Sequence, residues 1–154
     1  MVTKALVLVL AYCLFLSNVN ASRFKDCGSK FSQVSAVDVS PCPSEPCPLI
    51  KNENSTVTIT FNPTEDVSGG YAQVHGIIAH VPLPFNLPDT TLCPHLIPSG
   101  CPMAKGQKAI YNFTLPISSS YPSISVIIRW ELVDQNGNDI VCVDFPAKIV
   151  SQFD

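Results

Sequence analysis

Cysteine is the residue whose chemistry stands out in this chain of 154 residues, which contains seven of them. So many thiols in a small protein serve either as ligands of a metal such as zinc or as partners in disulfides. Structural zinc sites usually draw on closely paired cysteines, as in Cys-x-x-Cys. Even the two nearest cysteines here, Cys42 and Cys47, have Pro-Ser-Glu-Pro between them. The spacing therefore favours disulfides over a metal site, and with them an oxidising compartment.

The first 21 residues have the pattern of a secretory signal peptide. Lys4 precedes the apolar run 5–16, and the segment ends on the small residue Ala21. The run is shorter than the ~20 residues that a transmembrane helix needs. We expect cleavage after Ala21, with an uncleaved anchor as the alternative. Cys13 is lost with residues 1–21, and residues 22–154 are expected to form one secreted domain.

Six cysteines remain, and they can form three disulfides in about fifteen ways. The spacing narrows this choice. Cys42 and Cys47 enclose a short loop, and so do Cys93 and Cys101, so that both pairs close easily. Cys27 is then left to pair with Cys142, which ties the two ends of the domain together. On the chain-entropy account, such a wide loop contributes up to ~4–5 kcal/mol.

Residues that could carry out catalysis are scarce. The sequence has no Gly-x-Ser-x-Gly motif, phosphate-binding glycine loop or His-Glu-x-x-His motif. Its three histidines are His75, His80 and His95. The first two are an odd number of residues apart and would point to opposite faces of a regular strand. We expect surface or loop histidines, no metal, no cofactor and no enzymatic activity.

The charge distribution also excludes a class of partner. The formal net charge is −3, and no basic stretch is present. Nucleic-acid binding proteins present a basic patch or stripe to the phosphate backbone. We therefore expect no nucleic-acid partner.

The elements that position these residues are predicted by alternation of apolar and polar residues, the period of half-buried strands. In 56–61, for example, Val57, Ile59 and Phe61 alternate with threonines. The segment 71–81 is apolar on both sides, as a central strand would be. The predicted strands are 34–40, 56–61, 71–81, 108–115, 124–132 and 140–150, and Asn136-Gly137 favours a tight hairpin turn between the last two. The fourteen prolines argue against long helices.

The predicted fold is all-β, an antiparallel sandwich of about seven strands that resembles the immunoglobulin class. Proline-rich loops at 41–48 and 82–102 join the strands. Apolar residues continue into the loop 82–102, where core packing alone does not require them, and this makes a binding cavity plausible. Two N-glycosylation sequons are open to modification, at Asn54 and Asn112.

Several motifs resemble those of one family. They are Phe-Lys-Asp-Cys-Gly-Ser at 24–29, Val-Ser-Pro-Cys-Pro at 39–43, Val-His-Gly-Ile at 74–77, Val-Pro-Leu-Pro-Phe at 81–85 and Tyr-Pro-Ser-Ile at 121–124. Their order and spacing, and all six cysteines, are similar to the Niemann–Pick type C2 sterol carriers, whose domain is the ML lipid-recognition domain. The similarity covers residues 22–154.

The resemblance implies an immunoglobulin-like sandwich with a lipid cavity between its two sheets, and it supports the three cysteine pairs. It also implies roles for individual residues. Phe85 and Tyr121 match the aromatic gate of the pocket, and Val81 and Leu83 match its apolar rim. Further lining residues are expected at Leu115, Ile117 and Trp130. His80 and Arg129 depart from the residues usual in the vertebrate carriers and bear on sterol specificity.

The function expected from this resemblance is that of a secreted, monomeric carrier of one hydrophobic ligand, a sterol or a fatty acid. It would pass the ligand to a membrane surface or a membrane receptor, either outside the cell or in the lysosomal lumen. Two alternatives are an arthropod-type carrier of fatty-acid-like semiochemicals and a recognition module that presents a lipid to a receptor.

Overall fold

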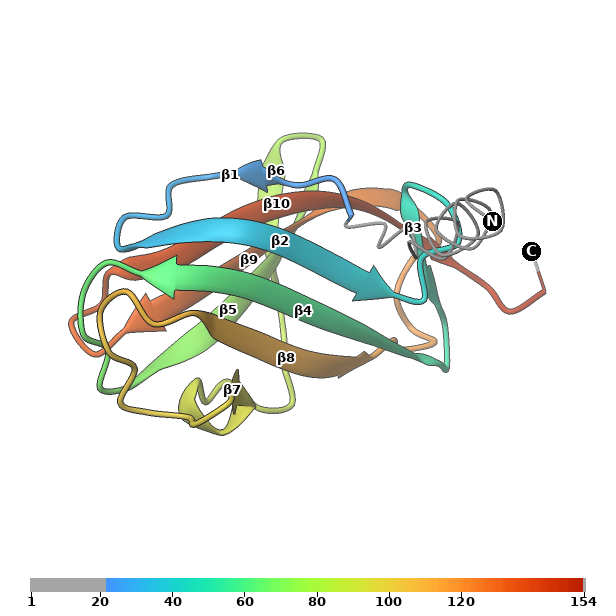
Figure 1. The fold of residues 1–154 in the computed structure, drawn as a ribbon. Helices are drawn as coiled ribbons and strands as arrows, with labels where there is room; N and C mark the ends of the chain where they lie inside the picture. The colour runs from blue at the N-terminus through green and yellow to red at the C-terminus, as the bar shows by residue number, and fades with distance from the viewer. Residues whose placement is uncertain (1–21, 154) are drawn as a thin grey trace, which may run out of the picture.

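The chain forms two facing β-sheets in a computed structural model that describes residues 22–153 (Figure 1). The larger sheet has the strand order β1 (Lys25–Asp26), β10 (Asp139–Val150), β9 (Ser125–Asp134), β5 (Gly70–Ile78) and β6 (Val81–Phe85), and β3 (Cys47–Ile50) also pairs with β10. The smaller sheet has the order β2 (Ser32–Ser40), β4 (Asn54–Pro63), β8 (Ala109–Pro116) and β7 (Leu96–Ile97). A short 3₁₀ turn, η2 (Cys93–His95), precedes β7.

This architecture confirms the predicted all-β sandwich. The six strands predicted from alternation correspond to β2, β4, β5, β8, β9 and β10, and four shorter strands complete the sheets. All strand pairs are antiparallel except the pair of β3 and β10, which is parallel. The predicted signal peptide, residues 1–21, lies outside the described residues.

Alternation determines which side chains reach the core. In β4, Val57, Ile59 and Phe61 are buried, whereas the threonines between them are partly exposed on the outer face. The inner faces of both sheets contribute to one continuous apolar core. Each large aliphatic or aromatic side chain in such a core contributes about 1.5–3 kcal/mol by leaving water.

The hairpin between β5 and β6 departs from the prediction of one strand over 71–81. Strand β5 ends at Ile78, and Ala79 and His80 form the turn with positive φ angles of 48° and 67°. The chain then returns as β6, a segment that the prolines had assigned to a loop. Proline is tolerated there because β6 lies at the edge of the sheet and pairs with β5 alone.

The predicted turn at Asn136-Gly137 joins β9 to β10. The Gly137 N–H donates to the carbonyl of Asp134 at 3.1 Å, and Gly137 takes a φ of 80°. The Asp134 carboxylate accepts hydrogen bonds from the backbone N–H groups of Asn136 and Asn138 at 2.8 and 2.9 Å. A glycine with positive φ after a type I turn is the usual geometry of a three-residue hairpin loop.

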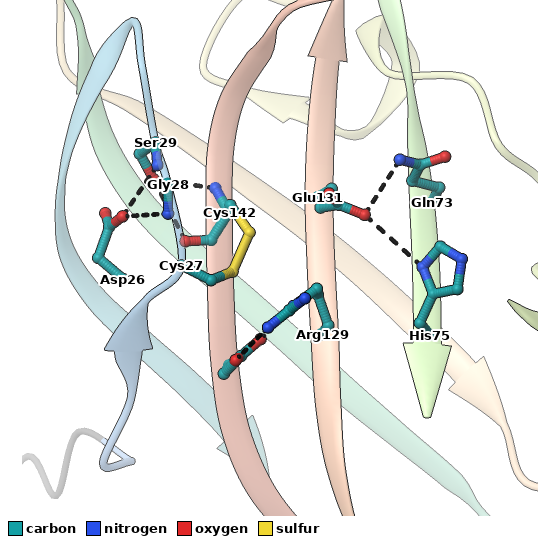
Figure 2. Close-up of a disulfide and its surroundings, with 10 residues drawn as sticks. Asp26, Cys27, Gly28, Ser29, Gln73, His75, Arg129, Glu131 and Cys142 are labelled. Carbon is teal, nitrogen blue, oxygen red and sulfur yellow. Dashed lines mark hydrogen bonds and ion pairs between the residues drawn. A yellow bond between two sulfur atoms is a disulfide. The ribbon is translucent and has the colours of Figure 1, made fainter. Parts of the chain in front are cut away.

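The three disulfides join Cys27 to Cys142, Cys42 to Cys47 and Cys93 to Cys101, as the spacing had predicted. The first links the end of β1 to the middle of β10 (Figure 2). Beside it, the Ser29 hydroxyl accepts a hydrogen bond from the Cys142 N–H at 2.9 Å. Within residues 22–153, no helix is both long enough and apolar enough to cross a bilayer.

Candidate functional site

A row of side chains on the inner face of the larger sheet leads from its edge to its centre. Phe85 of β6 lies opposite Val74 of β5, and Val74 lies opposite Trp130 of β9. Residues directly opposite in antiparallel strands project from the same face. Val74 and Trp130 are buried, while Phe85 at the edge is partly exposed. The register therefore connects the surface at Phe85 with the interior at Trp130.

The smaller sheet faces this row with the aromatic residues of β8. The ring centroids of Tyr111 and Phe113 lie 6.0 and 5.8 Å from that of Trp130, in tilted arrangements. Leu115, two residues further along β8, and Ile117, just beyond the strand, are buried in the same core. Such aromatic pairs contribute about 0.5–1.5 kcal/mol beyond the area that they bury. The contacts place Trp130 between the two sheets.

Phe85 and Tyr121 meet at the edge of the sandwich. Their ring centroids are 4.8 Å apart with an angle of 50° between the ring planes. Tyr121 comes from the loop between β8 and β9, so the contact joins this loop to the edge strand β6. Both side chains are partly buried, and burial raises the pKa of the Tyr121 hydroxyl. A hollow of about 200 Å³ opens beside Phe85, and Leu87 and Asn86 are among its lining residues.

Val81 and Leu83 are exposed on the same edge strand, at 55% and 48% of their full accessible area. They lie opposite Ile78 and Gly76 in the register of β5 and β6. Single exposed apolar side chains are common on protein surfaces, but Val81 and Leu83 together form a small apolar patch on one edge of the sheet. The structure thus divides the predicted site residues into three groups: a buried interior, a paired aromatic edge and an exposed apolar rim.

Two polar atoms lie buried among these apolar residues. The Tyr111 hydroxyl and the Trp130 indole nitrogen are both fully buried, and neither has a hydrogen-bond partner in the described chain. Burial raises the pKa of the Tyr111 hydroxyl; the nearby indole N–H opposes this effect and the charge of Asp89 adds to it. An unsatisfied buried polar group costs about 1–3 kcal/mol.

His95 covers the outer side of the aromatic residues on β8. Its ring centroid is 4.9 Å from that of Phe113 and 5.9 Å from that of Tyr111. Its Nε2 lies 2.8 Å from the carboxylate of Asp89, which also accepts hydrogen bonds from the hydroxyl and the N–H of Thr91 at 2.7 and 2.9 Å. These bonds, those from Thr91 foremost, lower the pKa of Asp89 to about 2.

Several polar side chains lie on the outer face of the larger sheet (Figure 2). Arg129 donates two hydrogen bonds of 2.8 Å to the carboxylate of Asp144. Glu131 accepts a hydrogen bond from Gln73 at 3.0 Å and lies 3.6 Å from His75. Arg129, one of the two departures from the vertebrate carriers, therefore lies outside the lining of the site, and the other, His80, is exposed in the hairpin turn. The described residues include no cluster of three or more possible metal ligands.

Comparisons of this sequence and fold with known proteins identify its family. Residues 21–149 match the family described as ML domain. The NPC intracellular cholesterol transporter 2 of Mus musculus is 38% identical over 146 residues, 92% of this chain and 97% of the mouse protein. The ecdysteroid-regulated 16 kDa protein of Manduca sexta is 39% identical over 88% of this chain and 94% of its own length.

The chain belongs to the Niemann–Pick type C2 family of ML domains. Its structure is similar to the crystal structure of a Niemann–Pick type C2 protein from the Japanese carpenter ant, with a TM-score of 0.77 and 32% identity over 83% of this chain and 99% of the ant chain. The fold is also shared with chicken MD-1, solved with lipid IVa, at a TM-score of 0.54 and 20% identity over 81% of this chain and 86% of the chicken chain.

Sequence reasoning missed the packing of two residues beside Trp130, Tyr111 and Phe113, and that of His95 on these two rings. Tyr111 and Phe113 had been placed only within the predicted strand 108–115, and His95, expected at the surface or in a loop, does lie in the loop between β6 and β7. The alternation of apolar residues in β8 could have identified Tyr111 and Phe113, because it places them on the same face as Leu115. The packing of His95 on Phe113 depends on the path of the loop 86–103, for which the sequence has no periodic signal.

Proposed function

We propose that this ML domain binds one hydrophobic lipid between its two sheets and transfers it between membranes. The observation that carries this proposal is the continuous apolar path from the Phe85–Tyr121 contact through Val74 to Trp130. One end of the path is at the surface and the other is in the buried interior. The proposal requires no catalytic step, because binding and release of an unchanged ligand are sufficient for a carrier.

Ligand entry requires Phe85 and Tyr121 to separate and the interior side chains to move apart. The edge strand β6 favours this movement, because it pairs with β5 alone and contains two prolines that lack an N–H donor. A ligand that buries about 400 Å² of apolar surface gains roughly 10 kcal/mol. Association costs of about 4–15 kcal/mol reduce this to reversible binding, as transfer requires.

The ligand proposed first is a sterol, because the mouse relative is named a cholesterol transporter. A fatty acid or a similar single-chain lipid is the second ligand to test. Transfer would take place at the exposed rim of Val81 and Leu83, the apolar surface next to the aromatic contact. We further propose that the protein is a secreted monomer, which the lysosomal lumen also accommodates.

N-glycosylation is proposed at the two sequons. Asn54 is exposed at the start of β4, where a glycan would extend into solvent. Asn112 is partly buried on the outer face of β8 and donates a hydrogen bond from its amide to the Thr58 hydroxyl at 2.9 Å. A glycan on Asn112 would have to replace this bond, so we expect higher occupancy at Asn54. Mass spectrometry of the secreted protein measures both.

The proposed function is tested by sterol transfer between vesicles. Donor vesicles carry dehydroergosterol, a fluorescent sterol, and acceptor vesicles carry a dansyl lipid that reports its arrival by energy transfer. The protein should accelerate transfer in proportion to its concentration. Phe85→Ala should reduce the rate strongly, whereas Phe153→Ala, a change at an exposed residue outside the site, should not. Transfer no faster than in the absence of protein, for both a sterol and a fatty acid, would contradict the proposal.

A further inference from the structure

Residues 22–26 connect the edges of the two sheets, and we call them the amino-terminal strap. The first residue of the strap, Ser22, lies against β2, which is the edge strand of the smaller sheet. The last two, Lys25 and Asp26, form β1 and pair with β10 of the larger sheet. The strap therefore joins the two sheets at the edge of the larger sheet that lies opposite β6.

Ser22 is buried at the start of this strap, at 7% of its full accessible area. Its backbone N–H donates to the carbonyl of Val37 at 3.0 Å, and its hydroxyl accepts from the N–H of Val39 at 3.3 Å. The hydroxyl oxygen also lies 3.7 Å from the sulfur of Cys47, which is in a disulfide and has no hydrogen to donate, so the hydroxyl is the donor. Chain ends are poorly ordered unless they are tied down, and these bonds tie Ser22 to β2.

The second residue of the strap, Arg23, is held by the loop 42–47. Its backbone N–H donates to the carboxylate of Glu45 at 2.6 Å, and its guanidinium Nε lies 3.6 Å from the same carboxylate. Glu45 lies inside this short loop, whose ends are joined by a disulfide, and the closed loop restricts where the carboxylate can lie. The negative charge is thus one residue away from the Ser22 nitrogen, where it favours a positively charged amino terminus.

We propose that signal peptidase cleaves the bond between Ala21 and Ser22, and that the new amino terminus docks on β2 and covers its edge. The pattern of residues 1–21 predicts the cut, and the contacts of Ser22 make it the first residue that the folded domain needs. In the cleavage the peptide bond breaks as water gives its hydroxyl to the Ala21 carbonyl carbon and a proton to the Ser22 nitrogen. This step requires the secretion proposed above but no bound lipid.

The docked terminus protects the edge of β2 from other molecules. An edge strand presents unpaired N–H and C=O groups, to which a strand of a second molecule can bond. The carbonyl of Val37 and the N–H of Val39 are such groups, and Ser22 occupies both. The edge strand β6 limits such pairing by its two prolines, which have no N–H to donate. The strap gives β2 a comparable protection, and the expected state of the processed protein is a monomer.

The test uses the full chain, expressed through the secretory pathway of eukaryotic cells. Mass spectrometry of the secreted protein should find Ser22 as its amino-terminal residue. Docking is measured by amide hydrogen exchange of Val39. Ser22→Ala removes the acceptor of this N–H and should accelerate its exchange about two- to tenfold, the range expected for one hydrogen bond. Ser22→Thr keeps a hydroxyl and should restore most of the protection. Ser35→Ala is the matched control, because the Ser35 hydroxyl is also on β2 but donates to the carbonyl of Thr60.

Covering of the edge is tested by a chain from which Ser22 and Arg23 are deleted. This deletion leaves the backbone groups of Val37 and Val39 without their partners in the strap. Sedimentation velocity should then show dimers, and their fraction should rise with protein concentration. The unchanged protein and Ser35→Ala should remain monomeric under the same conditions.

Three results would overturn the inference. One is a secreted protein that begins at any residue other than Ser22. Another is exchange of the Val39 N–H that Ser22→Ala leaves unchanged, which would mean that the terminus does not dock on β2. The third is a deletion variant that stays monomeric, which would show that the strap does not protect this edge. In each case sterol transfer between vesicles would still support the proposed function, whereas a chain that keeps residues 1–21 in the cell membrane would contradict both the cleavage and the proposed secretion.

Discussion

Strands β10 and β6 belong to the same sheet but are held in it very differently. β10 has β9 on one side and both β1 and β3 on the other, and the Cys27–Cys142 disulfide fixes it to the chain beyond β1. β6 pairs with β5 alone, contains two prolines and leaves Val81 and Leu83 exposed. Figure 1 shows β10 running along the length of the sandwich, with β6 as a short strand at the edge.

The difference between these strands indicates how a close-packed sandwich can admit a ligand. The free energy needed to open a segment locally differs from place to place in a protein, and segments with few contacts to neighbouring strands open most easily. The side of the sandwich near β10 is held together by a disulfide and by backbone hydrogen bonds to three other strands. We therefore expect opening on the side of β6, which pairs with one strand. The lipid path begins on that side, at Phe85. The experiments below test this contrast.

The largest effect is expected from removing the disulfide beside β10. Replacing both Cys27 and Cys142 by serine should lower the free energy of unfolding by about 4–5 kcal/mol, because the bond closes a loop of 115 residues. The matched pair of changes at Cys42 and Cys47, which close a loop of five residues, should cost about 2 kcal/mol. Urea unfolding measures both. Equal losses would mean that loop length does not determine the contribution of these disulfides.

The next effect compares two phenylalanines, one on each strand. Phe145 of β10 is fully buried, so Phe145→Ala should lower the free energy of unfolding by about 3–5 kcal/mol. Phe85 of β6 is half-buried, and Phe85→Ala should cost only about 1–2 kcal/mol while reducing lipid affinity at least tenfold. Urea midpoints and sterol binding are measured together. A large stability loss with unchanged affinity in Phe85→Ala would make this residue part of the ordinary core.

The contrast between the strands also explains what the sequence could and could not predict. Strands β9 and β10 were predicted because their alternating residues record which face is buried, and β5 was predicted because its segment is apolar on both sides. β6 was missed because an edge strand tolerates prolines and because Ala79 and His80 form a turn without asparagine or glycine. For the site, Phe85, Tyr121 and Trp130 came from motif resemblance. The unpaired hydroxyl of Tyr111 depends on three-dimensional packing, which no spacing along the chain specifies.

A smaller effect is expected at the rim of β6. Leu83→Ser should lower the free energy of unfolding by no more than about 1 kcal/mol, because about half of the side chain is already exposed. It should slow sterol transfer to vesicles severalfold, because less apolar surface remains to contact the membrane. Ile127→Ser is the matched control: Ile127 is also exposed but lies on β9 away from the edge. Equal slowing by both variants would show that general surface hydrophobicity, not the rim, promotes transfer.

The smallest effect concerns Asp89, in the loop that follows β6. Hydrogen bonds from Thr91 and the contact with His95 lower the pKa of this carboxyl from its ordinary value of 3.8 to about 2. A group whose pKa is lowered by folding stabilises the protein when it is ionised, so the contribution is present above about pH 4 and is lost as the pH falls toward 2. Asp89 is exposed, and solvent screening keeps the effect small.

Thermal unfolding between pH 5 and pH 2 tests this expectation. Asp89→Asn should melt slightly below the unchanged protein at pH 5, and the difference should disappear near pH 2, where the unchanged protein has lost the same bonds. Glu65→Gln, a change at an exposed carboxylate in the turn before β5, should leave the pH profile parallel to that of the unchanged protein. If the Asp89→Asn difference persists undiminished at pH 2, the carboxylate does not stabilise this loop through its charge. The loop beside β6 would then depend on the Cys93–Cys101 disulfide, and the two sides of the sandwich would be less different than their strand pairing indicates.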